Sequence, residues 1–482
     1  MLFNSFEYLI FLPVVFILYW SIKPNQYKWQ NVLLIVASYI FYGWWDYRFL
    51  FLLIFSTSLD FFTGLKIFQA QTTNHKKIWL FISIFINLGF LGFFKYYNFF
   101  IDSFSELLAT FGFQPNIWSL KIILPVGISF YTFHGLSYVL DIYNGKIKPT
   151  KNIIDYSLFV SFFPLLVAGP IERATHLLPQ LQRIRTFNYS KAADGLRQIL
   201  WGVFKKIVIA DNCAVVVNNI FDNYETLPAS NLVLGAVLFA FQIYGDFSGY
   251  SDIALGSARL LGIELLKNFN FPYFSRDIAE FWRRWHISLT TWFRDYLYIP
   301  LGGSRVSKTK SIRNTFIIFI VSGFWHGANW TFILWGLYHA LLFVPLLLME
   351  KNRKNTNIVA ENKLLPTWKE FFSIIITFIL VTFGWIIFRA DNLSMAFNYI
   401  ANIFSYSIFQ LPKLSFINFW NLVPAILSII ILLFMEWIHR KKHFGLDISF
   451  KSKVVRWILY IVLILLIIEL GGSQQDFIYF QF

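Results

Sequence analysis

A succession of long apolar runs is the feature that most limits how this chain can fold. The runs extend from residue 6 to residue 470 and are separated by short polar loops. An apolar run of about 17 to 22 residues spans the hydrocarbon core of a bilayer as a helix, which satisfies its own backbone there. The pattern predicts about twelve spanning helices, near residues 6–22, 30–45, 48–65, 78–94, 122–140, 198–220, 230–250, 314–333, 334–349, 371–388, 420–438 and 454–470.

The composition excludes a soluble protein. Of the 482 residues, 57% are hydrophobic and only 14% are charged, and no soluble stretch is long enough for a second domain. We therefore expect a single integral-membrane domain over residues 1–482, surrounded by membrane lipid. The formal net charge of +15 lies mostly in short loops, where orientation in the membrane explains it without nucleic acid. No spacing typical of a metal site stands out, so we expect no metal.

The Lys and Arg residues also predict the orientation of the chain. They are concentrated in alternate loops, from Lys23 and Lys28 near the start to Lys451 and Lys453 near the end. Loops rich in these residues stay on the cytoplasmic side of a membrane. The pattern predicts a multi-pass protein of the cytoplasmic (inner) membrane, with the N-terminus and the C-terminal tail, residues 471–482, on the extracytoplasmic side.

Two apolar segments do not read as simple spans. Residues 153–170 are interrupted by Pro164 and closed by Gly169 and Pro170, and residues 270–302 carry four arginines among Trp and Phe. Irregular backbone at membrane depth is tolerated only where protein buries it or where it lines a wet cavity. We predict an all-α polytopic fold with re-entrant and amphipathic helices around a central funnel or tunnel that opens to the cytoplasm.

Two histidines are the main candidates for chemistry. His326 lies in the apolar run that begins at Asn314, beside Gly323, Gly327 and Asn329. A neutral imidazole there can take a proton from a hydroxyl group and return it, although a core histidine bonded to a carbonyl is the competing interpretation. His286 follows Trp282, Arg283, Arg284 and Trp285, and it could orient a donor or shuttle a proton.

The arginines beside His286 can hold phosphates with paired hydrogen bonds. Trp and Arg also favour the membrane surface, and this structural interpretation is the stronger one for Arg283 and Arg284 taken alone.

Other polar groups have simpler interpretations. We expect His339 and His134 to be core residues, and Asp246 and Asp252 to pair with arginines of the amphipathic segment. The C-terminal sequence FIYFQF is expected to be exposed on the outer face. Such an aromatic end can lie in the membrane interface, but the Tyr479 hydroxyl also meets the needs of a covalent acyl relay.

Five motifs together resemble the membrane-bound O-acyltransferases, in the branch that includes alginate O-acetylation proteins, peptidoglycan O-acetyltransferases and the D-alanyl transferases of teichoic acids. They are PVGISFYTF (125–133), FFPLLVAGPI (162–171), DFSGYSDIA (246–254), RDIAEFWRRWHISLTTWFRDYLYIPLGGSR (276–305) and SGFWHGANWTFILWGLYHA (322–340). The resemblance implies transfer of an acyl group, usually from cytoplasmic acetyl-CoA, through a membrane-embedded tunnel to an extracytoplasmic acceptor. It implies His326 as the general base and His286 on the donor side. By likeness to the partner peptides of D-alanylation, it makes Tyr479 a candidate relay.

The resulting hypothesis has acetyl-CoA as acyl donor, with Arg283, Arg284, Trp282, Trp285 and Asn329 as residues that bind it. An extracytoplasmic SGNH-hydrolase-like partner would then pass the acetyl group to a polysaccharide such as alginate, peptidoglycan or another exopolysaccharide. The rival hypotheses are a polysaccharide-export transporter or channel with proton-relay histidines, and an inactive scaffold. Donor-dependent covalent transfer by the purified protein distinguishes the enzyme from both.

Overall fold

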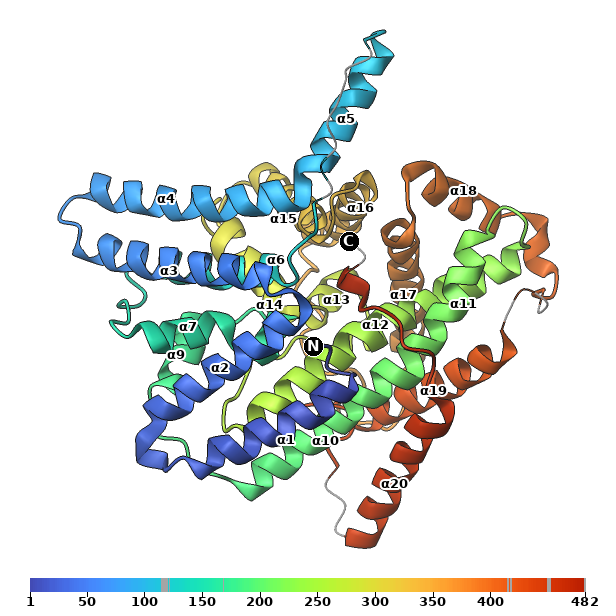
Figure 1. Ribbon diagram of the computed structural model, residues 1–482. Coiled ribbons are helices and arrows are strands. Elements are labelled where there is room, and N and C mark those ends of the chain that lie inside the picture. The colour runs from blue at the N-terminus through green and yellow to red at the C-terminus, as the bar shows by residue number, and fades with distance from the viewer. Residues whose placement is uncertain are drawn as a thin grey trace. The chain divides into compact units, whose positions relative to one another are not determined.

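The computed structural model describes residues 1–113, 120, 122–167, 169–413, 416, 418–448 and 452–480, and these residues form helices and loops without any strand (Figure 1). The predicted all-α class is therefore confirmed. The chain divides into two compact units, the first made of Met1–Ala192 and Ser257–Leu266, the second of Ala193–Gly256 and Lys267–Phe482.

Unit 1 contains the N-terminal helices, with 3-10 or π-helical turns between some of them. They are α1 (Phe6–Ser21), η1 (Pro24–Gln26), α2 (Tyr27–Asp46), α3 (Arg48–Gln69), α4 (Thr73–Leu91), η2 (Gly92–Tyr96), α5 (Tyr97–Thr110), α6 (Ile128–Tyr143), α7 (Ile153–Ser161), α8 (Phe163–Leu166) and α9 (Ala174–Leu181).

Unit 2 contains most of α10 (Tyr189–Phe204) and α12 (Ala229–Leu260) and all of the remaining elements. These are η3 (Lys205–Ala210), α11 (Asp211–Asp222), η4 (Pro272–Phe274), α13 (Ile278–Arg284), α14 (Ile287–Phe293), η5 (Arg294–Tyr298), α15 (Lys308–His326), α16 (Trp330–Leu348), α17 (Trp368–Arg389), α18 (Leu393–Ile403), η6 (Tyr406–Phe409), α19 (Phe419–Ile438), α20 (Lys453–Leu470) and η8 (Ile478–Phe480).

Among the described residues, six helices are long and apolar enough to cross a membrane. They are Arg48–Gln69, Thr73–Thr110, Ala229–Leu260, Trp330–Leu348, Trp368–Arg389 and Phe419–Ile438, and the pair Phe6–Ser21 with Pro24–Asp46, bent by 110°, makes a seventh if counted as one span. The structure thus supports a multi-pass membrane protein but does not confirm twelve spans. Some predicted spans are too short or too charged, as in α6 with 16 residues and α20 with three charged side chains in 18.

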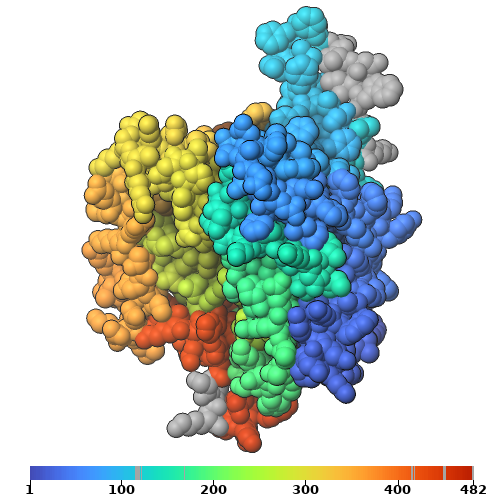
Figure 2. Space-filling view, turned by 90° about the vertical axis from the view of Figure 1, so that its left-hand side faces the viewer, coloured from blue at the N-terminus to red at the C-terminus, as the bar shows by residue number. Residues whose placement is uncertain are grey.

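The surface of unit 1 has the apolar character of a lipid-facing protein. Figure 2 shows α4, in blue, at the surface of the molecule. Along this helix, Phe81 and Phe85 are 65% and 79% exposed. The polar side of the same helix points inward. Ser83 Oγ donates to Asp60 Oδ1 at 2.7 Å, and Asn87 Nδ2 donates to that oxygen at 2.8 Å, so α3 and α4, which lie side by side in Figure 1, share a buried hydrogen-bond network.

The two interrupted segments form short helices, as the sequence predicts. In unit 1, residues 153–170 give α7 and α8, of nine and four residues. In unit 2, residues 270–302 give η4, α13, α14 and η5, none longer than seven residues. Each is far below the roughly 20 residues that a spanning helix needs. Their entry side and the funnel stay predictions.

One predicted span is wrong. The apolar run 314–333 is divided, because α15 ends at His326 and α16 begins at Trp330. Asn329 is the N-cap of α16, and its side chain accepts a hydrogen bond from the Thr331 backbone N–H at 3.0 Å. His326 is therefore the last residue of a helix and not a residue within a span.

Candidate functional site

The α15–α16 pair of unit 2 holds His326 in a fixed place. Glycines allow the two helices to pack at backbone contact: a Cβ at Gly323 would lie 2.2 Å from the Phe332 carbonyl oxygen, and one at Gly336 would lie 2.3 Å from that of Phe319. Such positions accept only glycine. The side chain of His326 is 4% exposed at the end of this tight helix pair.

His286 occupies the break between α13 and α14. Its backbone has φ 41° and ψ 54°, in the left-handed region that non-glycine residues rarely adopt. The flanking chain is tied down, since Ile287 N donates to the Asn268 carbonyl at 2.8 Å and Trp285 N donates to the Phe281 carbonyl at 2.8 Å. Strained backbone that the surroundings enforce is concentrated at functional sites.

The ring of His286 is buried, and its nitrogens receive no hydrogen bonds from the described residues in place of those to water. The residue is 1% exposed, and neither ring nitrogen has a hydrogen-bond partner among the described residues. Burial away from water lowers the pKa of His286 to about 3, so the imidazole is neutral at physiological pH. A neutral ring offers one N–H donor and one acceptor nitrogen.

The C-terminal tail brings a tyrosine to the same place. The ring centroid of Tyr479 lies 5.7 Å from that of His326 and 6.5 Å from that of His286, and the two imidazole centroids are 6.5 Å apart. Phe247 of α12 contacts both His286 and Tyr479, at 4.6 and 4.7 Å. Three residues from distant parts of the sequence, each predicted as catalytic, thus meet within unit 2. Burial raises the pKa of Tyr479 well above its usual value, so its hydroxyl keeps its proton.

The tail itself corrects the sequence interpretation. Phe477 and Ile478 are 0% and 1% exposed, so the prediction of an exposed aromatic end is wrong for these residues. Phe477 packs on Tyr250 of α12 with ring centroids 4.3 Å apart. Its apolar residues find a buried place inside unit 2, which composition alone does not show. The membrane side of the tail stays a prediction.

Aromatic rings surround the two histidines. His326 contacts Trp325, Trp335 and Phe388 at centroid distances of 5.0, 5.1 and 5.5 Å. Behind this layer, His339 lies 5.0 Å from both Trp282 and Trp335, and it is fully buried, as expected of a core residue.

Trp285, the other predicted donor-binding tryptophan, packs against Trp385 at 4.8 Å. Trp282 and Trp285 therefore belong to the aromatic wall of the site.

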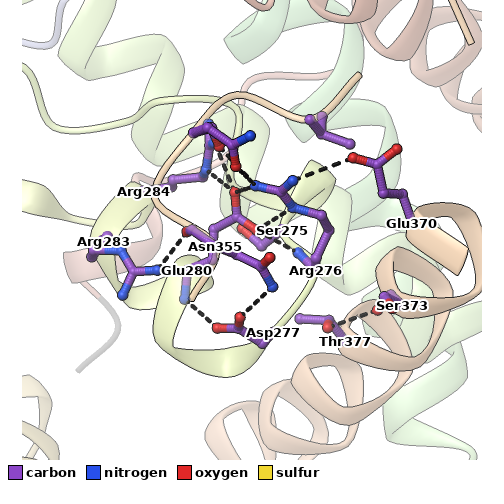
Figure 3. A network of polar contacts seen from close by, with 12 residues as sticks. Ser275, Arg276, Asp277, Glu280, Arg283, Arg284, Asn355, Glu370, Ser373 and Thr377 are labelled. Carbon is purple, nitrogen blue, oxygen red and sulfur yellow. Dashed lines mark hydrogen bonds and ion pairs between the residues drawn. The ribbon is translucent and has the colours of Figure 1, made fainter. Parts of the chain in front are cut away.

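The arginines beside His286 belong to a dense polar network (Figure 3). Glu280, which is 1% exposed, accepts hydrogen bonds from Arg276 at 3.0 Å and from Arg284 at 2.8 Å. Arg276 also pairs with Glu370 at 3.3 Å. Arg283 donates to the backbone carbonyls of Asn352 and Asn355, each at 2.7 Å. Both arginines that the sequence assigns to the donor are already bonded within the protein.

Glu280, the centre of this network, was not among the residues predicted for the site. Arg276, Glu280 and Arg284 stand four residues apart, the spacing at which charges meet on one face of a helix, so the pattern was available in the sequence. Asn329, also assigned to the donor, caps α16 and donates from Nδ2 to the Asp391 carbonyl at 2.8 Å.

Two lysines were also missed. Lys205 and Lys206 lie in the π-helical turn η3 and are 2% and 1% exposed. Lys205 pairs with Asp252 at 2.6 Å, and Lys206 pairs with Asp246 at 2.9 Å. The prediction that these aspartates pair with arginines of the amphipathic segment is therefore wrong. Adjacent lysines inside an apolar run are costly and were the signal for such partners.

The site offers acid–base and nucleophilic chemistry. Within the described part of the chain, no group of three or more His, Cys, Asp or Glu side chains could hold a metal ion. The converging groups are two buried imidazoles, surrounded by aromatic rings, and the phenol hydroxyl of the partly exposed Tyr479. Such an arrangement suits proton transfer from the hydroxyl to an imidazole while the oxygen attacks an electrophile.

The sequence is similar to a known protein family and to several known proteins. The profile of the family described as MBOAT, membrane-bound O-acyltransferase, matches residues 146–388. The "Probable alginate O-acetylase AlgI" of Pseudomonas aeruginosa is 41% identical over 88% of this chain and 78% of its own length. The peptidoglycan O-acetyltransferase of Helicobacter pylori is 36% identical over 82% and 78%. The teichoic acid D-alanyltransferase of Bacillus subtilis is 32% identical over 57% and 71%.

Proposed function

The chain belongs to the membrane-bound O-acyltransferase family and is an O-acyltransferase, and we propose that it moves an acetyl group from cytoplasmic acetyl-CoA across the inner membrane for O-acetylation of an extracytoplasmic polysaccharide. The convergence of His286, His326 and Tyr479 carries the proposal. The names of the relatives, an alginate O-acetylase and a peptidoglycan O-acetyltransferase, support a polysaccharide acceptor.

In the first step, His326 acts as the general base. It takes the proton of the Tyr479 hydroxyl while that oxygen attacks the thioester carbonyl of acetyl-CoA. A carbon–oxygen bond forms and the carbon–sulfur bond breaks. The proton on His326 then passes to the leaving thiolate, which yields CoA as a free thiol and an acetyl ester on Tyr479. The raised pKa of Tyr479 explains why a base is required, since the hydroxyl does not ionise by itself.

His286 orients the donor in the same step. Because its pKa is lowered to about 3, it remains a neutral imidazole whose N–H can point at the thioester oxygen. Negative charge develops on that oxygen during attack, and a fixed donor in a dry site stabilises it. The strained backbone at His286 sets the direction of the ring.

The aromatic wall keeps water from the acetyl group. Trp335 and Phe388 contact His326, Trp282 packs on Trp335, and Trp285 packs on Trp385, which in turn contacts Trp335. Water that reached the thioester or the tyrosyl ester would hydrolyse it, so enclosure by rings protects the intermediate.

Donor binding falls to the rim of this region. Arg283 is the exposed arginine of the pair, and we assign it to the phosphates of acetyl-CoA. Arg284 and Asn329, whose bonds are used within the protein, support the backbone around the donor. The second transfer, from Tyr479 to the polysaccharide, falls to an extracytoplasmic SGNH-hydrolase-like partner.

The decisive experiment uses the purified full-length protein in lipid nanodiscs with radiolabelled acetyl-CoA. We expect label on the C-terminal peptide, removable by hydroxylamine as an ester is. His326→Gln should slow labelling by roughly 10²- to 10⁴-fold, the usual contribution of a general base. Tyr479→Phe should remove the label from that peptide.

His75→Gln on the exposed start of α4 is the control and should label at the wild-type rate. Labelling that survives in His326→Gln at the control rate removes His326 from the mechanism. A protein that never becomes labelled, and instead moves polysaccharide across vesicles, would establish the transporter.

A further inference from the structure

The C-terminal tail is attached to a buried group of charges that none of the steps above uses. Lys206 Nζ forms ion pairs with Asp211 at 2.7 Å and with Asp246 at 2.9 Å. All three side chains are at most 3% exposed. The same ammonium group donates to the Gln475 carbonyl at 3.1 Å, and Asp246 Oδ2 accepts the backbone N–H of Ile478 at 2.6 Å.

We propose that the cluster of Lys206, Asp211 and Asp246 is a positioning device that seats the C-terminal tail so that Tyr479 lies beside His326. The inference rests on the proposed acetyl relay. The two bonds from the cluster reach the tail at Gln475 and Ile478, and Tyr479 is the next residue.

The direction of the bonds supports this role. The position of a side chain depends on the position of its backbone. The hydrogen bond from the Ile478 N–H holds the backbone at the residue directly before Tyr479. A hydrogen bond to a charged acceptor is about twice as strong as a neutral one. Phe477, between the two anchored residues, is fully buried against Tyr250 of the same helix that carries Asp246. In Figure 1 the tail, in red, lies beside α12.

The start of the tail is fitted just as closely. Gly472 N donates to the Ile207 carbonyl at 3.1 Å, and a Cβ at Gly472 would lie 2.8 Å from the Asn212 backbone nitrogen. Asn212 Nδ2 in turn donates to the Leu470 carbonyl at 2.7 Å. The tail therefore crosses η3 and the start of α11 at contact distance, next to the residues that form the cluster.

Stability alone gives a weak reason for this cluster. Taking charges out of water costs several kcal/mol per ion, and apolar residues of equal volume often serve packing as well or better. A charged cluster does offer what apolar packing lacks, which is directional bonds to the backbone of the tail. Lys205 and Lys206 are the first two residues of the π-helical turn η3, and π-turns within helices are frequent at functional sites.

The neighbouring ion pair supplies a matched control. Lys205 and Asp252 come from the same two elements, η3 and α12; the Lys205 side chain is as buried as the cluster, at 3% exposed, and that of Asp252 is 15% exposed. Lys205 also donates to Ser248 Oγ at 2.8 Å, and Asp252 also accepts from Gln198 Nε2 at 2.8 Å, so these bonds stay within α10, η3 and α12 and do not reach the tail. Asp252→Asn should therefore perturb the pairing of η3 with α12 without releasing the tail, whereas Asp246→Leu should release it.

The test measures tail seating directly, by hydrogen–deuterium exchange of the C-terminal peptide of the full-length protein in nanodiscs. In Asp246→Leu we expect exchange at least tenfold faster than in wild type, and in Asp252→Asn the wild-type rate. The rate of acetyl-tyrosine formation at saturating acetyl-CoA should fall ten- to a hundredfold in Asp246→Leu, with the KM for acetyl-CoA within twofold of wild type. Asp246→Glu should recover part of the rate.

A second variant covers failure of the first to fold. The triple variant Lys206→Met, Asp211→Asn and Asp246→Leu removes every charge of the cluster, so no buried ion is left unpaired. It should fold and still show fast tail exchange. Slow exchange in either folded variant overturns the proposal, and so does fast exchange with an unchanged rate of acetylation.

A wild-type protein that forms no acetyl-tyrosine refutes the relay instead. The exchange data then decide, independently, whether the cluster seats the tail.

Discussion

Two buried regions of unit 2 differ in how completely their polar side chains are hydrogen-bonded. In the arginine network of Figure 3, the Glu280 carboxylate binds Arg276 and Arg284, and the surrounding groups bond one another. At the histidine site, His286 has a strained backbone and no hydrogen-bond partner among the described residues. Both regions hold buried ionisable residues. The difference teaches that filled hydrogen bonds identify the arginine network as architecture, whereas open bonds alone do not identify chemistry, since both ring nitrogens of the core residue His339 also lack a partner among the described residues. His286 differs from His339 in its strained backbone and in its place beside His326 and Tyr479.

A substitution in the arginine network should lower stability more than a substitution at the histidine site. Glu280→Gln keeps the shape of the side chain but leaves Arg284 without a carboxylate and Arg276 with Glu370 alone. Breaking a buried ion pair on one side costs about 3 to 5 kcal/mol. We expect a markedly lower Tm in detergent, measured by the fluorescence of the tryptophans.

The control for this variant is Asp295→Asn in the Arg294–Asp295 pair, whose side chains are 58% and 28% exposed. An exposed pair contributes under about 1 kcal/mol, so the Tm should change little. Equal losses in the two variants would show that the Glu280 network is no more structural than a surface pair.

Much of this contrast could be predicted from sequence, and the rest depended on contacts between distant segments. The helical class, the broken segment around His286 and the two histidines follow from local patterns. The partners of Asp246 and Asp252 did not, because nothing local links α12 to Lys205 and Lys206. The burial of Phe477 was missed for the same reason, since a short aromatic end can equally lie in the membrane interface.

The end of α15 at His326 was a different kind of failure. Gly327 and Asn329 are a stop and a cap, and the cap signal was present in the sequence. An apolar run that continued on both sides outweighed it. In a sequence this rich in apolar residues, hydropathy does not locate the ends of helices. Single capping residues then predict the helix ends better than the length of the apolar run.

The histidine site predicts a pH dependence of stability. Because burial lowers the pKa of His286 to about 3, the unfolded chain binds its proton near pH 6.5 and the folded chain does not. Stability therefore falls as pH drops below about 6.5, by about 2 kcal/mol from this residue at pH 5. In His286→Gln we expect a shallower fall of Tm between pH 7 and pH 5.

His176 gives the comparison with opposite sign. Glu172 bonds its ring at 2.8 Å and raises the pKa of His176, so this residue adds stability below about pH 6.5 and loses it as pH rises through the raised pKa. His176→Gln should thus make the acid decline steeper. A profile for His286→Gln that parallels wild type would mean that the ring is not held neutral, and the distinction between the two buried regions would lose its electrostatic basis.

The smallest expected effect lies at the boundary of the two regions, in the adjacent pair Arg283 and Arg284. Arg284 belongs to the filled network, so Arg284→Gln should lower Tm and leave the KM for acetyl-CoA within about twofold. Arg283 is exposed and bonds only loop carbonyls, which a phosphate can replace as an acceptor. Arg283→Gln should raise that KM about three- to tenfold, or about 1 kcal/mol, while kcat and Tm stay near wild type. Steady-state transfer from labelled acetyl-CoA measures both constants. A side chain that binds the donor phosphates cannot be removed without raising the KM. An unchanged KM in Arg283→Gln would therefore mean that Arg283, like Arg284, serves the structure and that other residues bind the donor.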